Sequence, residues 1–313
     1  FNTMLDNIGT LKNEGLEITV GVKIINQKDL KWSVEGNINF NQNLVERLRT
    51  DNPNEFYTAG VLSNNIPVLR VAAGKPVGAF FGLRSEGLWD SLGIATASAG
   101  LRRSAQEGER RFMDLNGDGL LNDLDRTWIG NAVPVAFGGF NTTISYKNFE
   151  LTAYFSYAYG HQVFNQFMIN WGTMTGLNNV RKDAYDTRYR AILPGMDAKT
   201  IADLREQNKR ATTVVAGTTA DQRESTDYFI ENADFFRCRD ISLSYKLPAS
   251  LIKKLKVQNI QVYGNVQNLF IITKYSGFNP EIGASSGRGF TRGIDNGAAP
   301  LALAYRFGFT VTL

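Results

Sequence analysis

The sequence predicts an all-β protein whose long antiparallel strands form part of a transmembrane barrel. Three observations favour this class: apolar residues alternate with polar or small ones along several segments, short and long connections alternate between those segments, and aromatic residues reach 12%. Alternation with a period of two is typical of a strand with two unlike faces. No segment approaches the roughly 18 consecutive apolar residues of a membrane-spanning helix, so any span must be a strand.

The clearest alternation is LALAYRFGFTVTL, residues 301–313. Every second residue is apolar: Leu301, Leu303, Tyr305, Phe307, Phe309, Val311 and Leu313. A strand of this length exceeds the roughly 5 to 6 residues typical of soluble proteins and suits the roughly 9 to 11 that cross a bilayer. A strand of a soluble sandwich remains the alternative for this segment taken alone.

Other segments repeat the pattern, and their connections sort by length. The strand segments are GLEITVGVKII (15–25), LKWSVEGNINFNQN (30–43), the two runs within 136–160, DISLSYKLP (240–248) and IQVYGNVQNLFIIT (260–273). The short connections lie around 26–29, 147–148 and 248–258, and the long ones around 46–65, 92–134, 161–234 and 274–300. Outer-membrane barrels show this sorting, with short periplasmic turns and long outer loops. We therefore expect the apolar face to meet lipid.

Composition excludes several other classes. The net charge of +4 comes from mixed signs along the whole chain, which gives no basic patch for nucleic acid. The single cysteine, Cys238, excludes an internal disulfide and a multi-cysteine metal site. The chain starts at FNTMLDNIG, without an initiator Met or a signal peptide, so we expect it to be the interior of a longer protein.

Five stretches in succession resemble the C-terminal part of the SusC/RagA family of TonB-dependent outer-membrane transporters. They are NIGTLKNEGLEITV, MDLNGDGLLNDLDRTWIGN, FNTTISYKNFELTAYFSYAYG, ADFFRCRDISLSYKLP and VYGNVQNLFIITKYSGFNPEIG. The resemblance implies a barrel of about 22 strands with a plugged lumen. It also implies energy supplied through TonB, a SusD-like lipoprotein that caps the barrel from outside, and import of glycan or peptide oligomers.

On this resemblance, residues 1–313 are the C-terminal barrel segment, with roughly the last seven to nine strands. The plug domain, the N-terminal strands and the TonB-contacting region are expected to lie outside this chain. The family usually ends in an aromatic residue, whereas this chain ends at Leu313. Two alternatives remain: a secreted β-sandwich that binds calcium and carbohydrate, and a structural or adhesin-type outer-membrane barrel. Substrate identity and the oligomeric state of the complex with the lipoprotein are not predicted.

Enzyme motifs are weak. His161 is the only histidine, and no serine lies in a GxSxG elbow. The Gly-rich stretch GASSGRGF (283–290) lacks the lysine of a phosphate-binding loop, so a mobile loop is favoured. Nothing places Asp183 and Asp186 about a substrate as a glycosidase requires. We expect no catalysis, and we interpret Cys238 as a packed strand residue.

The connection 161–234 is the candidate binding region. It carries aromatic residues among amides and charges, and Trp171, Tyr185 and Tyr189 are candidate contacts for a sugar or peptide substrate. Packing within the loop, or contact with the lipoprotein, is the alternative for these side chains. TRYRAILPG (187–195) and KTIADLREQNKR (199–210) are expected to form short helices here, and PASLIKKLK (248–256) a short helix on the periplasmic side.

The stretch DLNGDGLLNDLD, residues 114–125, predicts a calcium site. Its spacing matches a calcium loop in which ligands alternate with spacers and glycine takes the sixth position. The expected ligands are Asp114, Asn116, Asp118, the Leu120 carbonyl, Asn122 and Asp125. The flanks look extended rather than helical, and Asp125 stands where the EF-hand has a longer Glu. A polar turn that needs no ion is the alternative.

Overall fold

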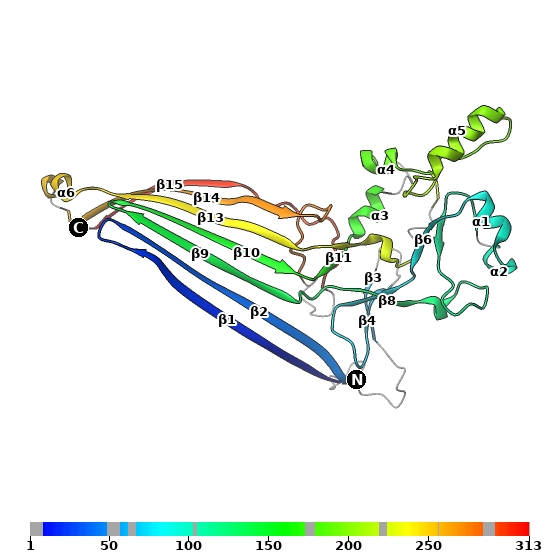
Figure 1. The fold of residues 1–313 in the computed structure, drawn as a ribbon, viewed down its shortest axis with the longest axis horizontal. Helices are drawn as coiled ribbons and strands as arrows, with labels where there is room; N and C mark the ends of the chain where they lie inside the picture. The colour runs from blue at the N-terminus through cyan, green and yellow to red at the C-terminus, as the bar shows by residue number, and fades with distance from the viewer. Residues whose placement is uncertain are drawn as a thin grey trace, which may run out of the picture.

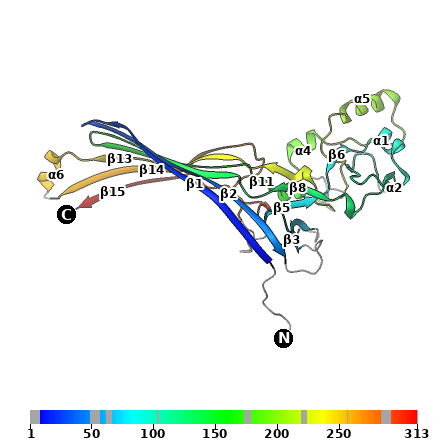
Figure 2. The same ribbon diagram turned by 60° about the horizontal axis from the view of Figure 1, so that its bottom comes forward.

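The computed structural model describes residues 9–48, 57–61, 67–102, 105–172, 179–218, 224–255, 257–283 and 292–312. Its main element is one antiparallel sheet of seven strands in the order β1-β2-β9-β10-β13-β14-β15. The strands are β1 (Gly9–Asn26), β2 (Leu30–Leu48), β9 (Ala136–Tyr146), β10 (Phe149–Tyr159), β13 (Phe235–Lys246), β14 (Asn259–Thr273) and β15 (Ala304–Thr312). They run side by side along the long axis of the molecule (Figure 1), and the sheet is visibly twisted when turned (Figure 2). The all-β prediction is confirmed.

The strand register gives the sheet two chemically different faces. One row of paired residues across all seven strands is apolar except for one glycine: Ile25, Trp32, Ile144, Leu151, Leu243, Gly264 and Phe307. An adjacent row lies on the opposite face and is polar or charged throughout: Lys23, Ser33, Thr143, Thr152, Ser242, Asn265 and Arg306. Successive side chains of a strand point to opposite faces, so a single register maintains this division.

The apolar face is exposed rather than packed against a second layer. Phe307 is 81% exposed and Phe309 is 73% exposed, and large apolar side chains on the other strands of the sheet are exposed as well. Among the described strands, β1 and β15 each have one unpaired edge, so the sheet is not closed on itself. An open edge in hydrocarbon would leave backbone groups without partners, so this sheet needs further strands to stand in a membrane.

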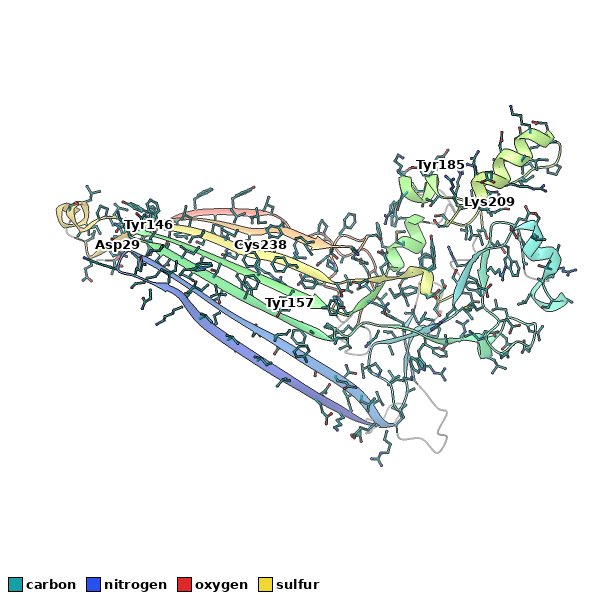
Figure 3. The ribbon with its side chains drawn as sticks, in the orientation of Figure 1. Asp29, Tyr146, Tyr157, Tyr185, Lys209 and Cys238 are labelled. Carbon is teal, nitrogen blue, oxygen red and sulfur yellow. The ribbon has the colours of Figure 1, made fainter. Side chains whose placement is uncertain are left out.

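The connections sort by length as the sequence predicts. Residues 27–29, the two residues 147–148, and the segment with α6 (Ala249–Leu255) join strands at one end of the sheet. Residues 49–135, 160–234 and 274–303 join them at the other end. Figure 3 shows this division: Asp29 and Tyr146 lie at the short-turn end, and Tyr185 and Lys209 lie among the long connections.

The long connections contain small sheets and helices of their own. One sheet has the order β3 (Tyr57–Val61), β4 (Pro67–Val71), β5 (Ala79–Gly82) and β8 (Thr127–Asn131), and two pairs are β6 (Ser85–Leu88) with β7 (Arg110–Phe112) and β11 (Gln162–Phe164) with β12 (Ile230–Asn232). The helices are α1 (Ser91–Thr96), α2 (Ala99–Arg102), α3 (Gln166–Gly172), α4 (Lys182–Asp186) and α5 (Ala198–Asn208), with the 3-10 turns η1 (Asp123–Asp125) and η3 (Asp227–Phe229). No helix in the described ranges is long and apolar enough to cross a membrane.

Three expectations about the elements need correction. The connections expected at 46–65 and 92–134 are one connection, because the described residues between them enter the small strands β4, β5 and β6. The last strand begins at Ala304 rather than 301, because its pairing with β14 ends at Gln267. The next residue, Asn268, has a positive φ of 54°, and its side-chain amide donates to the Ala302 carbonyl at 3.0 Å.

The third correction concerns TRYRAILPG, which is not a helix. Thr187 accepts backbone hydrogen bonds from Thr212 at 2.9 Å and Thr213 at 3.1 Å, and Tyr189 donates to the Thr213 carbonyl at 2.8 Å. These partners lie in the segment after α5, so tertiary pairing overrides local propensity here. The other two expected helices are confirmed as α5, which Asp197 caps, and α6.

Candidate functional site

A row of aromatic rings lies on the apolar face, in the half of the sheet nearer the long connections. Phe140 and Phe155 stack with ring centroids 4.7 Å apart, Phe155 and Phe236 are 5.4 Å apart, and Phe236 and Phe270 are 6.4 Å apart. These rings cross four neighbouring strands. Cys238 pairs with Phe155 and Phe270 in the same row and is fully buried, which confirms its interpretation as a packed strand residue.

The three long connections share one hydrophobic core. Its buried members are Val68, Leu69, Phe80 and Ala132 from the first connection, Phe164, Ile169 and Phe229 from the second, and Ile294 from the third. The Phe164 ring lies 6.3 Å from that of Phe80 and 6.2 Å from that of Phe229. Its backbone pairs with the third connection through hydrogen bonds to Gly293 at 2.8 Å and from Asp295 at 2.9 Å. The connections therefore form one packed body, which we call the outer loop body.

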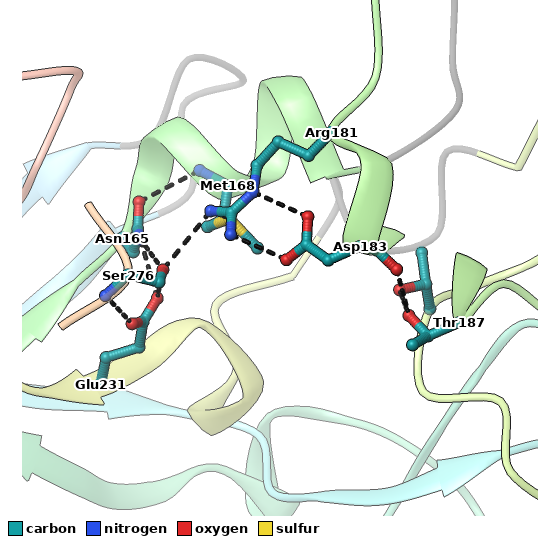
Figure 4. Close-up of polar contacts among 8 residues, drawn as sticks. Asn165, Met168, Arg181, Asp183, Thr187, Glu231 and Ser276 are labelled. Atoms are coloured by element: carbon teal, nitrogen blue, oxygen red, sulfur yellow. Dashed lines mark hydrogen bonds and ion pairs between the residues drawn. The ribbon is translucent and has the colours of Figure 1, made fainter. Parts of the chain in front are cut away.

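A polar network reinforces the contact between the second and third connections (Figure 4). The Glu231 carboxylate accepts hydrogen bonds from the Asn165 amide at 2.7 Å, the Ser276 backbone N–H at 2.8 Å and the Ser276 hydroxyl at 2.7 Å. Arg181 donates to both carboxylate oxygens of Asp183, at 3.0 and 2.7 Å, and so orders the start of α4. Asp183 is held ionised, because the hydrogen bonds from Arg181 lower its pKa.

Two further sets of polar contacts hold the third connection in place. The Tyr275 hydroxyl donates to Asp295 at 2.6 Å, and both residues are buried. Burial and the neighbouring Asp295 carboxylate raise the pKa of Tyr275 well above its usual range, so this hydroxyl remains a donor. Nearer the strands, Glu281 forms ion pairs with Arg237 at 3.2 Å and with Arg239, on the polar side of the sheet.

The three aromatic candidates occupy different environments. Trp171 in α3 is 38% exposed and stacks on Phe167 with centroids 5.5 Å apart. Tyr185 in α4 is 50% exposed, and the Arg188 guanidinium lies 3.7 Å over its ring. Tyr189 is only 5% exposed and packs within the outer loop body. Trp171 and Tyr185 therefore present accessible rings, whereas the buried ring of Tyr189 serves packing.

The candidate calcium loop is a compact series of side-chain-to-backbone turns. Asp114 accepts from the backbone N–H groups of Gly117 at 2.8 Å and Gly119 at 2.7 Å, Asn116 accepts from Asp118 at 3.0 Å, and Asp118 accepts from Leu120 at 2.8 Å. Gly119 has a φ of 80°, as the sharp turn at the sixth position requires. A hydrogen bond from Asn116 and the Leu120 N–H lower the pKa of Asp118, which keeps it ionised.

Asp125 closes this loop from the inside. It is fully buried, and its two oxygens accept from the backbone N–H groups of Leu115 at 2.9 Å and Asn122 at 2.8 Å. Asn122 caps η1 by accepting from Leu124 at 2.8 Å. The flanks, β7 and β8, are strands, as expected from the sequence.

The donor set suits a hard cation in its chemistry, because each carboxylate or amide oxygen that accepts one N–H keeps a second lone pair. The same backbone N–H groups also stabilise the carboxylates without an ion. Across the described ranges, no three His, Cys, Asp or Glu side chains gather closely enough to hold a metal. The calcium ion therefore stays a prediction from sequence. The GASSGRGF loop falls almost wholly outside the described residues.

Comparisons with known proteins agree with the two-faced sheet. No protein-family model matches the chain. The TonB-dependent receptor P3 of Formosa agariphila is 26% identical over 317 residues, which cover 99% of this chain and 29% of the relative. The TonB-dependent receptor SusC of Bacteroides thetaiotaomicron is 26% identical over 314 residues, 98% of this chain and 27% of the relative.

A solved structure, that of the RagAB peptide transporter, aligns with a TM-score of 0.71 at 20% identity. The alignment covers 98% of this chain and 29% of the chain in that structure. At this level of identity, the similarity shows the fold. The chain thus spans less than a third of the length of each of these proteins. The curated relatives are named as receptors rather than enzymes, as expected from the sequence.

Proposed function

Because this chain is homologous along almost its whole length to TonB-dependent receptors that include SusC, we propose that it is the C-terminal barrel segment of an outer-membrane transporter. The whole protein imports oligomeric nutrients through a plugged barrel, using energy delivered through TonB. The plug and the TonB contact belong to regions outside these 313 residues. No covalent chemistry is assigned to the segment.

The single observation that carries this proposal is the seven-stranded sheet with one exposed apolar face, one polar face and all long connections at one end. A wall between lipid and a water-filled lumen needs those two faces. The aromatic row from Phe140 to Phe270 then lies in the outer half of the membrane, and the α6 end faces the periplasm. A soluble sandwich would instead bury the apolar face against a second sheet.

The outer loop body supports the proposed partner, a SusD-like lipoprotein lid. A preformed, well-packed surface binds a partner with less loss of conformational entropy than separate flexible loops do. Oligosaccharides or peptides are the proposed cargo, and the exposed rings of Trp171 and Tyr185 offer faces on which sugar rings or side chains can stack. A calcium ion in the 114–125 loop would have a structural role, in bracing the first long connection.

Uptake by cells that carry the full-length gene tests the proposal. We expect import of an oligomer to stop when TonB is deleted, while the barrel still assembles and shows heat-modifiable gel mobility. The lipoprotein should co-purify in detergent, and shortening residues 161–234 should release it without loss of the barrel. Import that persists without TonB, or a protein extracted from cells without detergent, would contradict the proposal. An assembled barrel with no import at all would instead favour the adhesin-type alternative.

A further inference from the structure

A second recognition feature lies between α4 and the end of α5, at the tip of the outer loop body. Here the structure has a cavity of 370 Å³. It is lined by Asp186, Thr187, Arg188, Arg190, Glu206, Gln207, Arg210 and Ala211. Two residues next to it, Tyr185 and Lys209, mark its position in Figure 3, at the end of the molecule far from α6. The volume is within the range of small-ligand pockets, about 300 to 1,000 Å³.

The wall of this cavity is held in a fixed geometry. The side-chain oxygen of Asn208 accepts from the Arg190 backbone N–H at 2.8 Å, and the Asn208 amide donates to the Arg190 carbonyl at 2.9 Å. The Thr187 hydroxyl contacts that of Thr213 at 3.0 Å. These bonds join two segments about 20 residues apart and place their arginines around one space. Preorganised side chains lose less entropy when they bind.

The cavity has an excess of positive charge. Its two carboxylates already have cationic partners, since Asp186 pairs with Lys182 and Glu206 pairs with Lys209 at 2.5 Å. Those two acids and two lysines cancel, which leaves the charges of three arginines, Arg188, Arg190 and Arg210. In the part of the chain that the structure describes, no carboxylate forms an ion pair with any of the three.

One arginine is already oriented. The Arg188 guanidinium stacks on Tyr185 at 3.7 Å and donates to the Tyr185 carbonyl at 2.5 Å. A stacked guanidinium has a fixed plane, and its fork of N–H donors matches the two oxygens of a carboxylate. Gln207 adds an amide that can bond hydroxyls, and the Thr187 hydroxyl, which donates to the Asp183 carbonyl at 2.9 Å, can still accept from one. Ala211 is the only residue in the lining with a wholly apolar side chain. This lining suits an acid that also carries hydroxyl groups, because Thr187 and Gln207 can form hydrogen bonds with ring hydroxyls that a glutamate side chain lacks.

We propose that this cavity binds the carboxylate of an acidic sugar unit in the imported oligosaccharide. This inference rests on the proposed transport function and narrows its substrate class to acidic glycans. Arg190 and Arg210 bind the carboxylate, Arg188 supplies a preoriented donor, and Thr187 and Gln207 bond the hydroxyls of the ring.

Calorimetry on the full-length protein in detergent tests the proposal, with three probes. They are a trimer of galacturonic acid, the methyl ester of the same trimer, and a glutamate tetrapeptide. We expect the acid to bind more tightly than the ester and the peptide, and its affinity to fall as salt rises. Equal binding of the ester would overturn the role of charge. Equal binding of the peptide would overturn the sugar assignment, and absence of binding by the acid would overturn both.

The matched variants are the double substitution Arg190→Gln with Arg210→Gln, and the single control Lys199→Gln. Lys199 is an exposed cation on α5 that does not line the cavity. A hydrogen bond to a charged group corresponds to about tenfold in affinity, so the double variant should bind the acid about a hundredfold more weakly and the control nearly as the native protein does. Heat-modifiable mobility checks assembly of each variant. If acid binding is unchanged in the double variant, the inference is wrong, while TonB-dependent uptake of a neutral oligosaccharide would show that the transport proposal still holds.

Discussion

The sharpest prediction concerns Phe164, the residue through which all three long connections meet. Its side chain is fully buried near the rings of Phe80 and Phe229, and its backbone forms hydrogen bonds with Gly293 and Asp295. Truncation of a buried phenylalanine to alanine costs about 3 to 5 kcal/mol, because transfer energy is lost and a cavity remains. At about 1.4 kcal/mol per tenfold change, opening of the outer loop body in Phe164→Ala should become about two to four orders of magnitude more frequent.

Hydrogen exchange measured by mass spectrometry on the full-length protein in detergent checks this expectation. Faster exchange should appear together in 67–135, 160–234 and 292–303, while strands β9, β10 and β13 keep their protection. Phe278→Ala is the matched control, because Phe278 lies in the third connection but is 58% exposed. If Phe164→Ala accelerates exchange only within 160–234, the three connections do not share one core and the reasoning is refuted.

Three other predictions concern the two faces of the sheet, the 114–125 loop and the hydrogen bond between Tyr275 and Asp295. Phe309→Arg should block barrel assembly, since a charge on the lipid face costs about 2 to 4 kcal/mol, whereas Thr310→Arg on the other face should be tolerated; equal heat-modifiable mobility of both would refute the lipid assignment. Calcium should raise the melting temperature with an apparent Kd of about 10⁻⁴ to 10⁻³ M, and the double variant Asp114→Asn with Asp118→Asn should abolish this shift. If calcium does not shift the melting temperature of the native protein, the 114–125 loop is a polar turn that binds no ion. The pKa of Tyr275 is raised in the folded protein, so its contribution to stability is complete below about pH 10 and falls as pH rises further. Proteolysis of 274–283 should therefore increase from about pH 8 to about pH 11, and by less in Tyr275→Phe; identical profiles would contradict this.

The strands could be predicted from sequence because their signal is local. In the final strand each of Tyr305, Phe307 and Phe309 is separated from the next by a small or polar residue, so period and face follow directly from the letters. The sorting of the connections by length could also be predicted. The start of the final strand could not be predicted, because it depends on a positive φ at Asn268 in the neighbouring strand, which no pattern within 301–313 reveals.

The outer loop body could not be predicted from the sequence, because its contacts are not local. Phe80, Phe164 and Ile294 are far apart in the chain, and each sits in a stretch without a period that would mark it as core. The sequence around Glu231 and Ser276 likewise does not indicate that these two residues form hydrogen bonds with each other. Composition of the 161–234 connection suggested binding through aromatic rings, yet it could not separate a buried ring such as Tyr189 from an exposed one such as Tyr185. Nor did spacing suggest that Arg190 and Arg210 line one cavity.

The shared core of the outer loop body also constrains how this surface can diversify. Phe80 and Ile294 belong to one core, so a change of length or shape near Phe80 alters the packing around Ile294. We therefore expect that the connections cannot be exchanged one at a time between related proteins. Recombination that grafts a new outer surface must carry all three connections together, and chimeras that split them should assemble poorly. Freedom to vary is left at outward tips such as Gly195 and Gly217, where an added Cβ would meet no atom within 4 Å. Their positive φ values, 89° and 88°, still favour glycine or asparagine at those two points.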